Sequence, residues 1–169
     1  MAWTTPKTWS TNEVVTAANM NTHVRDNVAF LGAPPTCSAF NSVAQSLTSG
    51  VAAVMTADSE NFDTDTMHST SSNTSRITAT TAGRYLFFTT VVFAPNNIGQ
   101  RSVDFRFNGS TVTTMMTVDT TGALSCILTA VKTYVLTVGQ FVEVQAFQNS
   151  GGALNATLQE FGALLMTVT

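Results

Sequence analysis

Residues 36 to 169 form short segments rich in threonine, valine and phenylalanine, in which apolar and polar side chains alternate with the two-residue period of β-strands. Turn residues separate these segments at intervals of roughly 8 to 12 residues, a spacing typical of all-β sandwiches. The pattern predicts ten strands, at 36–43, 51–55, 61–67, 76–80, 84–94, 102–107, 111–118, 124–135, 140–147 and 158–168. Because no second helix is indicated, we expect an antiparallel sandwich or jelly roll.

The residues before this region predict one short helix. Residues 17–31 contain neither glycine nor proline, and the hydroxyl of Thr16 can cap their first turn. Gly32 and the two prolines that follow Ala33 end the helix. We therefore divide the chain into an N-terminal segment, residues 1–35, and a β-domain, residues 36–169.

One stripe of this helix has the alternating four- and three-residue spacing of a coiled-coil seam. The seam residues are Ala17, Asn21, Val24, Val28 and Leu31. A polar residue such as Asn21 within an apolar seam fixes the register between identical helices. Two interpretations remain open: the helix associates with its own copies about a threefold axis, or it packs on its own domain as an amphipathic helix. His23, Arg25 and Asp26 would lie on the solvated side.

Two of the expected strands are apolar on both faces. In 84–94, Tyr85 and Phe87 point to one side, and the equally apolar Leu86 and Phe88 point to the other. The last strand repeats this pattern. A two-layer sandwich covers only one face of a strand, so we expect the second face to be a subunit interface, with a thicker intramolecular core as the alternative. The expected interface residues are Leu86, Phe88, Val92, Leu164 and Met166.

The strands at 102–107 and 140–147 alternate strictly between apolar and polar residues. Val103 and Phe105 alternate with Asp104 and Arg106, which indicates one buried and one wet face. These two segments are therefore expected to be edge or outer-sheet strands. The pair Asn108-Gly109 supplies the positive dihedral angles of a two-residue hairpin.

The composition indicates a folded protein whose surface is partly covered by other chains. Of 169 residues, 44% are hydrophobic and only 10% are charged, which excludes disorder. The net charge of −3 leaves no basic surface for nucleic acid. No segment is long and apolar enough to span a membrane, and the polar start predicts a protein made and folded in a cytoplasm. So few charges are unusual for a free monomer, which favours contact with its own copies or another protein.

The residues that carry catalytic or metal chemistry are scarce. Cys37 and Cys126 lie far apart in sequence, and buried thiols are favoured over a disulfide. The loop histidine His68 is expected to be solvated, and no nucleophile, zinc or phosphate motif is present. We therefore expect no enzyme activity, no catalytic residues, no cofactor and no metal. One acidic stretch, 58–65, could hold calcium through alternating oxygen ligands, but a solvated acidic loop is favoured because the spacing lacks the glycine and bidentate glutamate of a dedicated loop.

Several motifs of the β-domain resemble those of the C1q/tumour-necrosis-factor-like jelly rolls. The most specific is Phe62-Asp63 followed by Gly83-Arg84-Tyr85-Leu86-Phe87, which is similar to the "F-D … G-x-Y-x-F" run of that family. Asn108-Gly109, the stretch 136–144 and the aromatic closing strand at 161–165 add to the likeness. Gly162 directly after Phe161, and Gln140 where an acid is common, depart from the pattern. The resemblance implies a ten-stranded jelly roll, preceded here by one short helix, that assembles as a homotrimer.

The N-terminal segment is similar to the opening of many bacteriophage structural proteins. Trp3, Trp9 and the run 13–27 carry this resemblance, which extends to tail-fibre, spike and head-decoration components. It implies an attachment or trimer-nucleating segment that displays the β-domain outward. Trp3 and Trp9 are then the expected particle anchors, because tryptophan buries a large apolar area at little cost in entropy.

Together the two resemblances predict a trimeric decoration, fibre or spike protein of a phage virion, assembled in the cytoplasm of a bacterial host. Its partners would be its own copies, other virion proteins of the capsid, collar or tail, and a host surface glycan, but neither nucleic acid nor membrane. The loops expected at the far end, 65–75, 95–101 and 148–155, would make the host contact through His68, Asn73, Asn96, Asn97 and Asn149. The alternative is a free bacterial C1q-like module that binds carbohydrate or another ligand.

Overall fold

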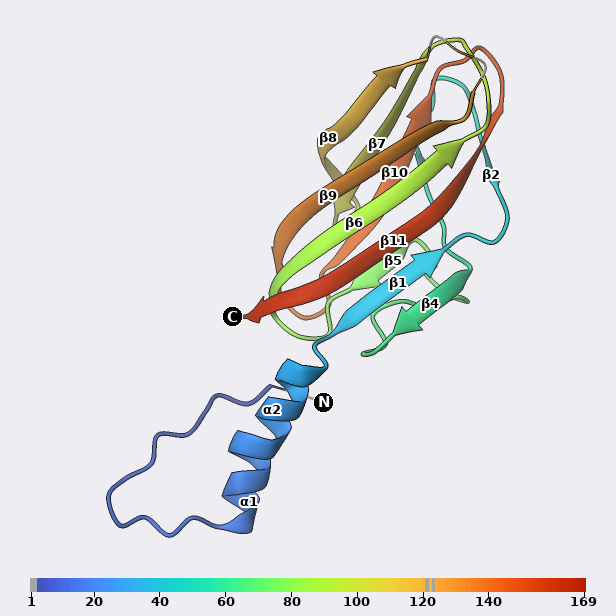
Figure 1. Cartoon of the computed structure of the whole chain (residues 1–169). Helices are drawn as coiled ribbons and strands as arrows, with labels where there is room; N and C mark the ends of the chain where they lie inside the picture. The colour runs from blue at the N-terminus through green and yellow to red at the C-terminus, as the bar shows by residue number, and fades with distance from the viewer. Residues whose placement is uncertain (1–2, 121, 123) are drawn as a thin grey trace.

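The computed structural model describes residues 3–120, 122 and 124–169 of the chain. An N-terminal segment without helix or strand, residues 3–16, is called the lead below. The lead and one helical segment precede two antiparallel β-sheets, and the helix projects beyond one end of the sheets (Figure 1). The helical segment consists of α1 (Ala17–Met20), a π-helical turn (Asn21–Arg25) and α2 (Asp26–Gly32). The strands are β1 (Thr36–Phe40), β2 (Gln45–Leu47), β3 (Ala53–Val54), β4 (Ser59–Asp63), β5 (Arg76–Thr78), β6 (Gly83–Phe93), β7 (Gln100–Phe107), β8 (Ser110–Asp119), β9 (Cys126–Leu136), β10 (Phe141–Gln148) and β11 (Leu154–Val168).

The strands form a six-stranded and a five-stranded sheet. The first has the order β4-β1-β11-β6-β9, with β2 paired to β11, and the second has the order β3-β10-β7-β8, with β5 paired to β10. This confirms the expected all-β sandwich with one short N-terminal helix. The short strand β2 was not predicted, because three residues are too few to show a period.

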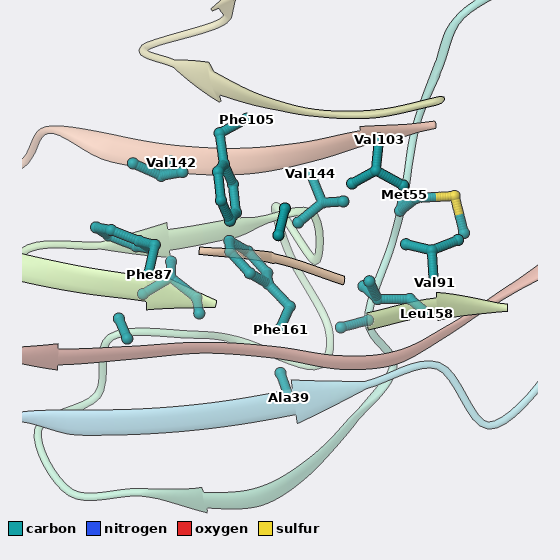
Figure 2. Close-up of a cluster of buried hydrophobic side chains, with 14 of the residues drawn as sticks. Ala39, Met55, Phe87, Val91, Val103, Phe105, Val142, Val144, Leu158 and Phe161 are labelled. Atoms are coloured by element: carbon teal, nitrogen blue, oxygen red, sulfur yellow. The ribbon is translucent and has the colours of Figure 1, made fainter. Parts of the chain in front are cut away.

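The inner faces of the two sheets enclose the core (Figure 2). Phe87 on β6 lies 6.4 Å from Phe105 on β7 and 6.3 Å from Phe161 on β11, measured between ring centroids. All three rings are fully or almost fully buried. Aromatic side chains from both sheets therefore meet at the centre of the sandwich, where each buries a large apolar area.

The expectation that 102–107 and 140–147 each have a wet face is wrong, and neither is an edge strand. The alternative that they belong to the outer sheet stays a prediction, because it depends on which sheet faces the other copies. β7 and β10 pair with each other in the middle of the five-stranded sheet, and the polar side chains Asp104 and Glu143 on their outer face are buried. Glu143 can be buried because Arg76 and Arg106 both pair with its carboxylate, at 3.2 and 3.4 Å. The Asn108-Gly109 hairpin between β7 and β8 is confirmed, with φ angles of 46° and 80°.

The helix is covered on one side by the lead. Trp3 stacks near Phe30, with ring centroids 5.8 Å apart, and the side chain of Asn27 bonds to both the backbone N–H and the carbonyl of Thr4. Thr16 caps the first turn as expected, by accepting a hydrogen bond from the N–H of Asn19. Among the described helices, none is long and apolar enough to cross a membrane.

Candidate functional site

The side of the six-stranded sheet that points away from the core, called the outward face below, carries a broad apolar surface. Strand pairing places one row of side chains across five strands. In order from β4 to β9, the row is Phe62, Ser38, Gly162, Phe88 and Val131. The ring of Phe88 lies directly on Gly162, where an added Cβ would meet the ring at 2.2 Å. A larger residue at position 162 would therefore displace the Phe88 ring from this site.

All five residues predicted for the subunit interface lie on the outward face or at the end of this face nearest the helix. Leu86, Phe88, Val92 and Leu164 are half-buried, and Met166 is 52% exposed. Their neighbours Tyr85, Phe87 and Val91 are fully buried on the opposite side of the same sheet, so the two-sided pattern of β6 is confirmed. The alternative of a thicker core is wrong, because these side chains point away from it.

Four further apolar residues of this face were missed from the sequence. Ile127, Val131 and Val135 on β9 are 60%, 53% and 58% exposed, and Phe62 on β4 is 50% exposed. On β9, the exposed residues Ile127, Val131 and Val135 alternate with residues that face the core, such as the buried Leu128 and Ala130. β9 therefore has the same two-sided pattern as β6. That pattern was the signal that could have revealed them.

The outward face also holds a small polar network and an exposed basic residue. Asn61 donates to the hydroxyl of Ser38 at 3.0 Å, and this hydroxyl donates to the carboxylate of Glu160 at 3.2 Å. Thr90 and Thr129 lie 3.3 Å apart, oxygen to oxygen, beside this network. Arg84 is exposed at the end of the face nearest the helix. A partner that covers this face must therefore accommodate the negative charge of Glu160 and the positive charge of Arg84.

The helix seam is exposed as well, which contradicts the alternative that it packs on the chain's own domain. Val24, Val28 and Leu31 are 40%, 63% and 67% exposed. The π-helical turn Asn21–Arg25 uses one residue more per turn than an α-helix, so it rotates Ala17 relative to the residues after it. The seam is consequently a continuous stripe only in its second half.

A shallow apolar hollow of about 120 Å³ joins the helix to the sheet. Phe30, Leu31 and Pro34 line one side, and Leu165 and Met166 of β11 line the other. The exposed apolar surface thus continues from the helix seam through this hollow to the outward face.

The two predicted anchor tryptophans differ in their environment. Trp3 packs against Phe30 of its own chain. In this conformation its ring is therefore not available for insertion into another protein. Trp9 is 37% exposed, with the Nζ of Lys7 5.0 Å from its ring. Val14 and Val15, which belong to the run 13–27, are 80% and 51% exposed on the same lead. The apolar surface of the lead is therefore Trp9, Val14 and Val15.

Three of the five predicted distal residues lie on the loops that follow β6 and β10, and Figure 1 shows these loops at the end of the sandwich opposite the helix. Asn149 accepts a hydrogen bond from the N–H of Gln100, and Asn96 accepts one from Ile98 at 2.8 Å, so the loops carrying Asn96, Asn97 and Asn149 are held together. The guanidinium of Arg101 is fully buried and donates to the carbonyls of Ile98 and Gln100. These contacts fix the shape of the far end.

The other two predicted distal residues, His68 and Asn73, lie on loop 65–75 near the helix end of the sandwich. The expectation that this loop belongs to the far end is therefore wrong. The loop begins beside the helix junction, where the N–H of Thr64 donates to Thr36 at 2.9 Å. His68 is 6% exposed rather than solvated, and its ring nitrogens face Glu60 at 2.8 Å and the carbonyl of Thr74 at 3.1 Å. Asn73 is exposed in the same loop. Hydrogen bonds to Glu60 and to the carbonyl of Thr74 hold the buried ring of His68 at this position.

The carboxylates of the acidic stretch point to separate partners. Asp58 accepts from the N–H and hydroxyl of Ser42, which lowers the pKa of its carboxyl. Asp63 accepts from the backbone N–H groups of Asp65 and His68. Within the described part of the chain, no three side chains of histidine, cysteine, aspartate or glutamate converge as metal ligands.

Both cysteines are free thiols, which confirms the preference for thiols over a disulfide. Cys37 is fully buried, and burial together with the nearby carboxylates Asp63 and Glu60 raises the pKa of its thiol to about 12. Burial also raises the pKa of the Cys126 thiol, against an opposing effect of Arg101. A neutral, buried thiol is a poor nucleophile.

Comparison with known proteins identifies the fold. No family model and no curated protein sequence matches the chain. Among solved structures, the globular domain of the zebrafish complement 1qA protein is similar with a TM-score of 0.61 and 15% identity, over 80% of this chain and 99% of that one. The Eiger TNF of S. frugiperda is similar with a TM-score of 0.53 and 12% identity, over 80% of this chain and 95% of that one. The chain therefore has a C1q/TNF-like jelly-roll fold, for which homotrimers are typical.

Proposed function

We propose that the chain is a homotrimeric structural protein of a bacteriophage virion, a decoration, fibre or spike component anchored by its N-terminal segment. The observation that carries the trimer is the outward face, where Phe62, Ile127, Val131 and Val135 are each at least half exposed around the half-buried Phe88. Contiguous apolar surface of this kind marks an interface in a protein with so few charges. The fold supports the same stoichiometry, because C1q/TNF-like domains typically form homotrimers.

In the proposed trimer, the outward faces and helix seams surround one threefold axis. The apolar surface continues from Leu31 through the hollow at Met166 to Leu164 and Leu86, which supports a single interface along both parts of the chain. Val24, Val28 and Leu31 would pack against the same residues of the other copies. Valine and leucine at such positions favour helix association through a narrow stripe.

The proposed anchor is the lead before the helix. It carries exposed Trp9, Val14 and Val15 and projects with the helix away from the β-domain (Figure 1). An apolar cluster that includes tryptophan suits insertion into a slot on a capsid, collar or tail protein. This geometry fits the phage-like residue pattern of the segment, with Trp9 rather than Trp3 as the accessible tryptophan.

The far end of the jelly roll would then face outward from the particle. Asn96, Asn97 and Asn149 lie there on loops that are fixed by mutual hydrogen bonds. Rigid amide-bearing loops suit hydrogen bonding to a host surface glycan, and many copies on one particle would convert weak contacts into useful avidity. Adhesion is thus the proposed second role of the displayed domain.

The competing proposal is a free bacterial C1q-like module that binds carbohydrate or another ligand. The fixed loops at the far end favour this proposal, because binding of a ligand by these loops does not require attachment to a virus particle. The two proposals differ in what the N-terminal segment does. Deletion of residues 1–31 should abolish incorporation into phage particles if the chain is a virion component, measured by mass spectrometry of purified particles. If the truncated chain is incorporated at the full level, the anchoring proposal is wrong.

A further inference from the structure

A polar pocket of about 200 Å³ opens beside loop 65–75, and none of its described lining residues is one of the outward-face residues named above. Hydrogen-bonding side chains dominate its lining: Thr66, Ser69, Ser72, Asn73, Arg76 and Thr78. No carboxylate belongs to the described lining residues. The pocket therefore offers hydroxyl, amide and guanidinium donors, and the acids beside it are already engaged: Glu60 and Asp63 bond to His68, and Glu143 bonds to Arg76.

Arg76 is held in place while the end of its guanidinium remains available. Its Nε donates to the buried carboxylate of Glu143 at 3.2 Å, and the guanidinium carbon lies 4.0 Å from the ring centroid of Phe141. Its two terminal nitrogens make no hydrogen bond to the described residues, and the side chain is 37% exposed. Glu143 also pairs with Arg106, so this cluster of three ions carries a net positive charge.

The loop that completes the pocket is fixed by its own hydrogen bonds. The backbone N–H of His68 donates to Asp63, its ring bonds to Glu60 and Thr74, and the carbonyl of Met67 accepts from Thr78 at 2.7 Å. Thr66 and Asn73, at the two ends of the pocket wall, both have positive φ angles, of 56° and 50°. Such conformations persist only where the surroundings hold them. The donors are consequently ordered before a ligand arrives, which reduces the entropic cost of binding.

We propose that this pocket binds a saccharide unit that carries a carboxylate, with the carboxylate on the terminal nitrogens of Arg76 and the sugar hydroxyls on the serine, threonine and asparagine side chains. A planar guanidinium matches a carboxylate in a bidentate arrangement, and charge-assisted hydrogen bonds are the stronger ones. The wall supplies donors and acceptors for the remaining hydroxyls. This inference does not depend on the trimer, on the virion role or on the loops at the far end.

The test is an NMR titration of the full chain with three probes: glucuronate, glucose and inorganic sulfate. Glucuronate should shift the amide signals of the pocket loop and the Nε signal of Arg76, at concentrations at which glucose shifts neither. Equal effects of glucuronate and glucose would overturn the charge-based recognition. Sulfate binding as tightly as glucuronate would overturn the saccharide part, because the hydroxyl contacts would then contribute nothing. No shift of the loop signals by any probe would overturn the site.

A matched pair of variants locates the binding. Ser72→Asp places a negative charge in the pocket wall, whereas Ser71→Asp places the same charge on the neighbouring exposed serine, which does not line the pocket. Repulsion between the introduced carboxylate and the carboxylate of the ligand predicts that Ser72→Asp weakens glucuronate binding by about tenfold or more, with a clearly smaller effect of Ser71→Asp. Equal weakening by both variants would refute the assignment to this pocket. Both positions are exposed, so neither variant is expected to disturb folding.

Discussion

Val131→Asp is the substitution that tests the proposed interface with least damage to the isolated chain. Val131 is 53% exposed on β9, and its side chain points away from the core. Fully burying a valine is worth roughly 1.5 to 3 kcal/mol, so covering the half that is still exposed would contribute about 0.8 to 1.6 kcal/mol for each copy. The substitution removes this contribution in all three copies of the proposed trimer.

The introduced carboxylate adds a larger effect. An unpaired charge buried in an interface costs several kcal/mol, whereas an aspartate on an exposed strand position costs about 1 kcal/mol or less. Each ~1.4 kcal/mol changes the association constant tenfold, so the trimer should dissociate at micromolar concentration while the jelly roll remains folded.

The assay is light scattering combined with circular dichroism on Val131→Asp and on Val138→Asp as a control. Val138 is 66% exposed in the turn before β10 and does not lie on the outward face. We expect a folded single chain for the first variant and an unchanged assembly for the control. An intact trimer of Val131→Asp, or equal dissociation of both variants, would refute the reasoning.

Three further predictions concern the chain itself. The pKa of the Cys37 thiol is raised from 9.0 to about 12, so its contribution to stability is complete below pH 9 and is lost as the pH rises toward 12, by about 1.4 kcal/mol per pH unit. Burial also raises the pKa of Cys126, Tyr85 and Tyr134, so denaturant titrations should show a loss of stability with pH that is steeper in the parent chain than in Cys37→Ala by about this slope; equal slopes would contradict the assignment to Cys37. Glu143→Gln leaves two arginines without their carboxylate and should lower the free energy of unfolding by about 2 to 3 kcal/mol, with a clearly smaller loss for the more exposed Glu13→Gln; equal losses would contradict the burial argument. Asn27→Ala should release the lead, giving faster proteolysis before residue 16 without a change in the melting temperature of the β-domain; an unchanged cleavage rate would count against the role of the Thr4 contacts.

The sequence predicted the fold class because its signals are local. The alternation in β6, the hairpin at Asn108 and the helix stop at Gly32 each depend on a few neighbouring residues, and the structure has all three. The π-helical turn was not predictable from the seam, because a seam count assumes a regular helix.

The positions of polar groups were less predictable because they depend on contacts between distant segments. The buried ring of His68 bonds to Glu60 and to the carbonyl of Thr74, and the buried Glu143 pairs with two arginines from other strands. The loop that contains Asn73 lies beside the helix junction rather than at the far end because β4 runs antiparallel to β1, which returns the chain to that junction. The spacing of residues along the chain does not indicate any of these contacts, so they could not be predicted from the sequence.

The central claim is that the outward face is covered by sister copies, and the molar mass of the unmodified chain in dilute solution tests it most directly. Light scattering should give about three times the mass of 17.9 kDa for one chain, unchanged over a wide range of concentration. A stable species of 17.9 kDa at all concentrations would contradict the account, since Phe62, Ile127, Val131 and Val135 would then face water without a partner.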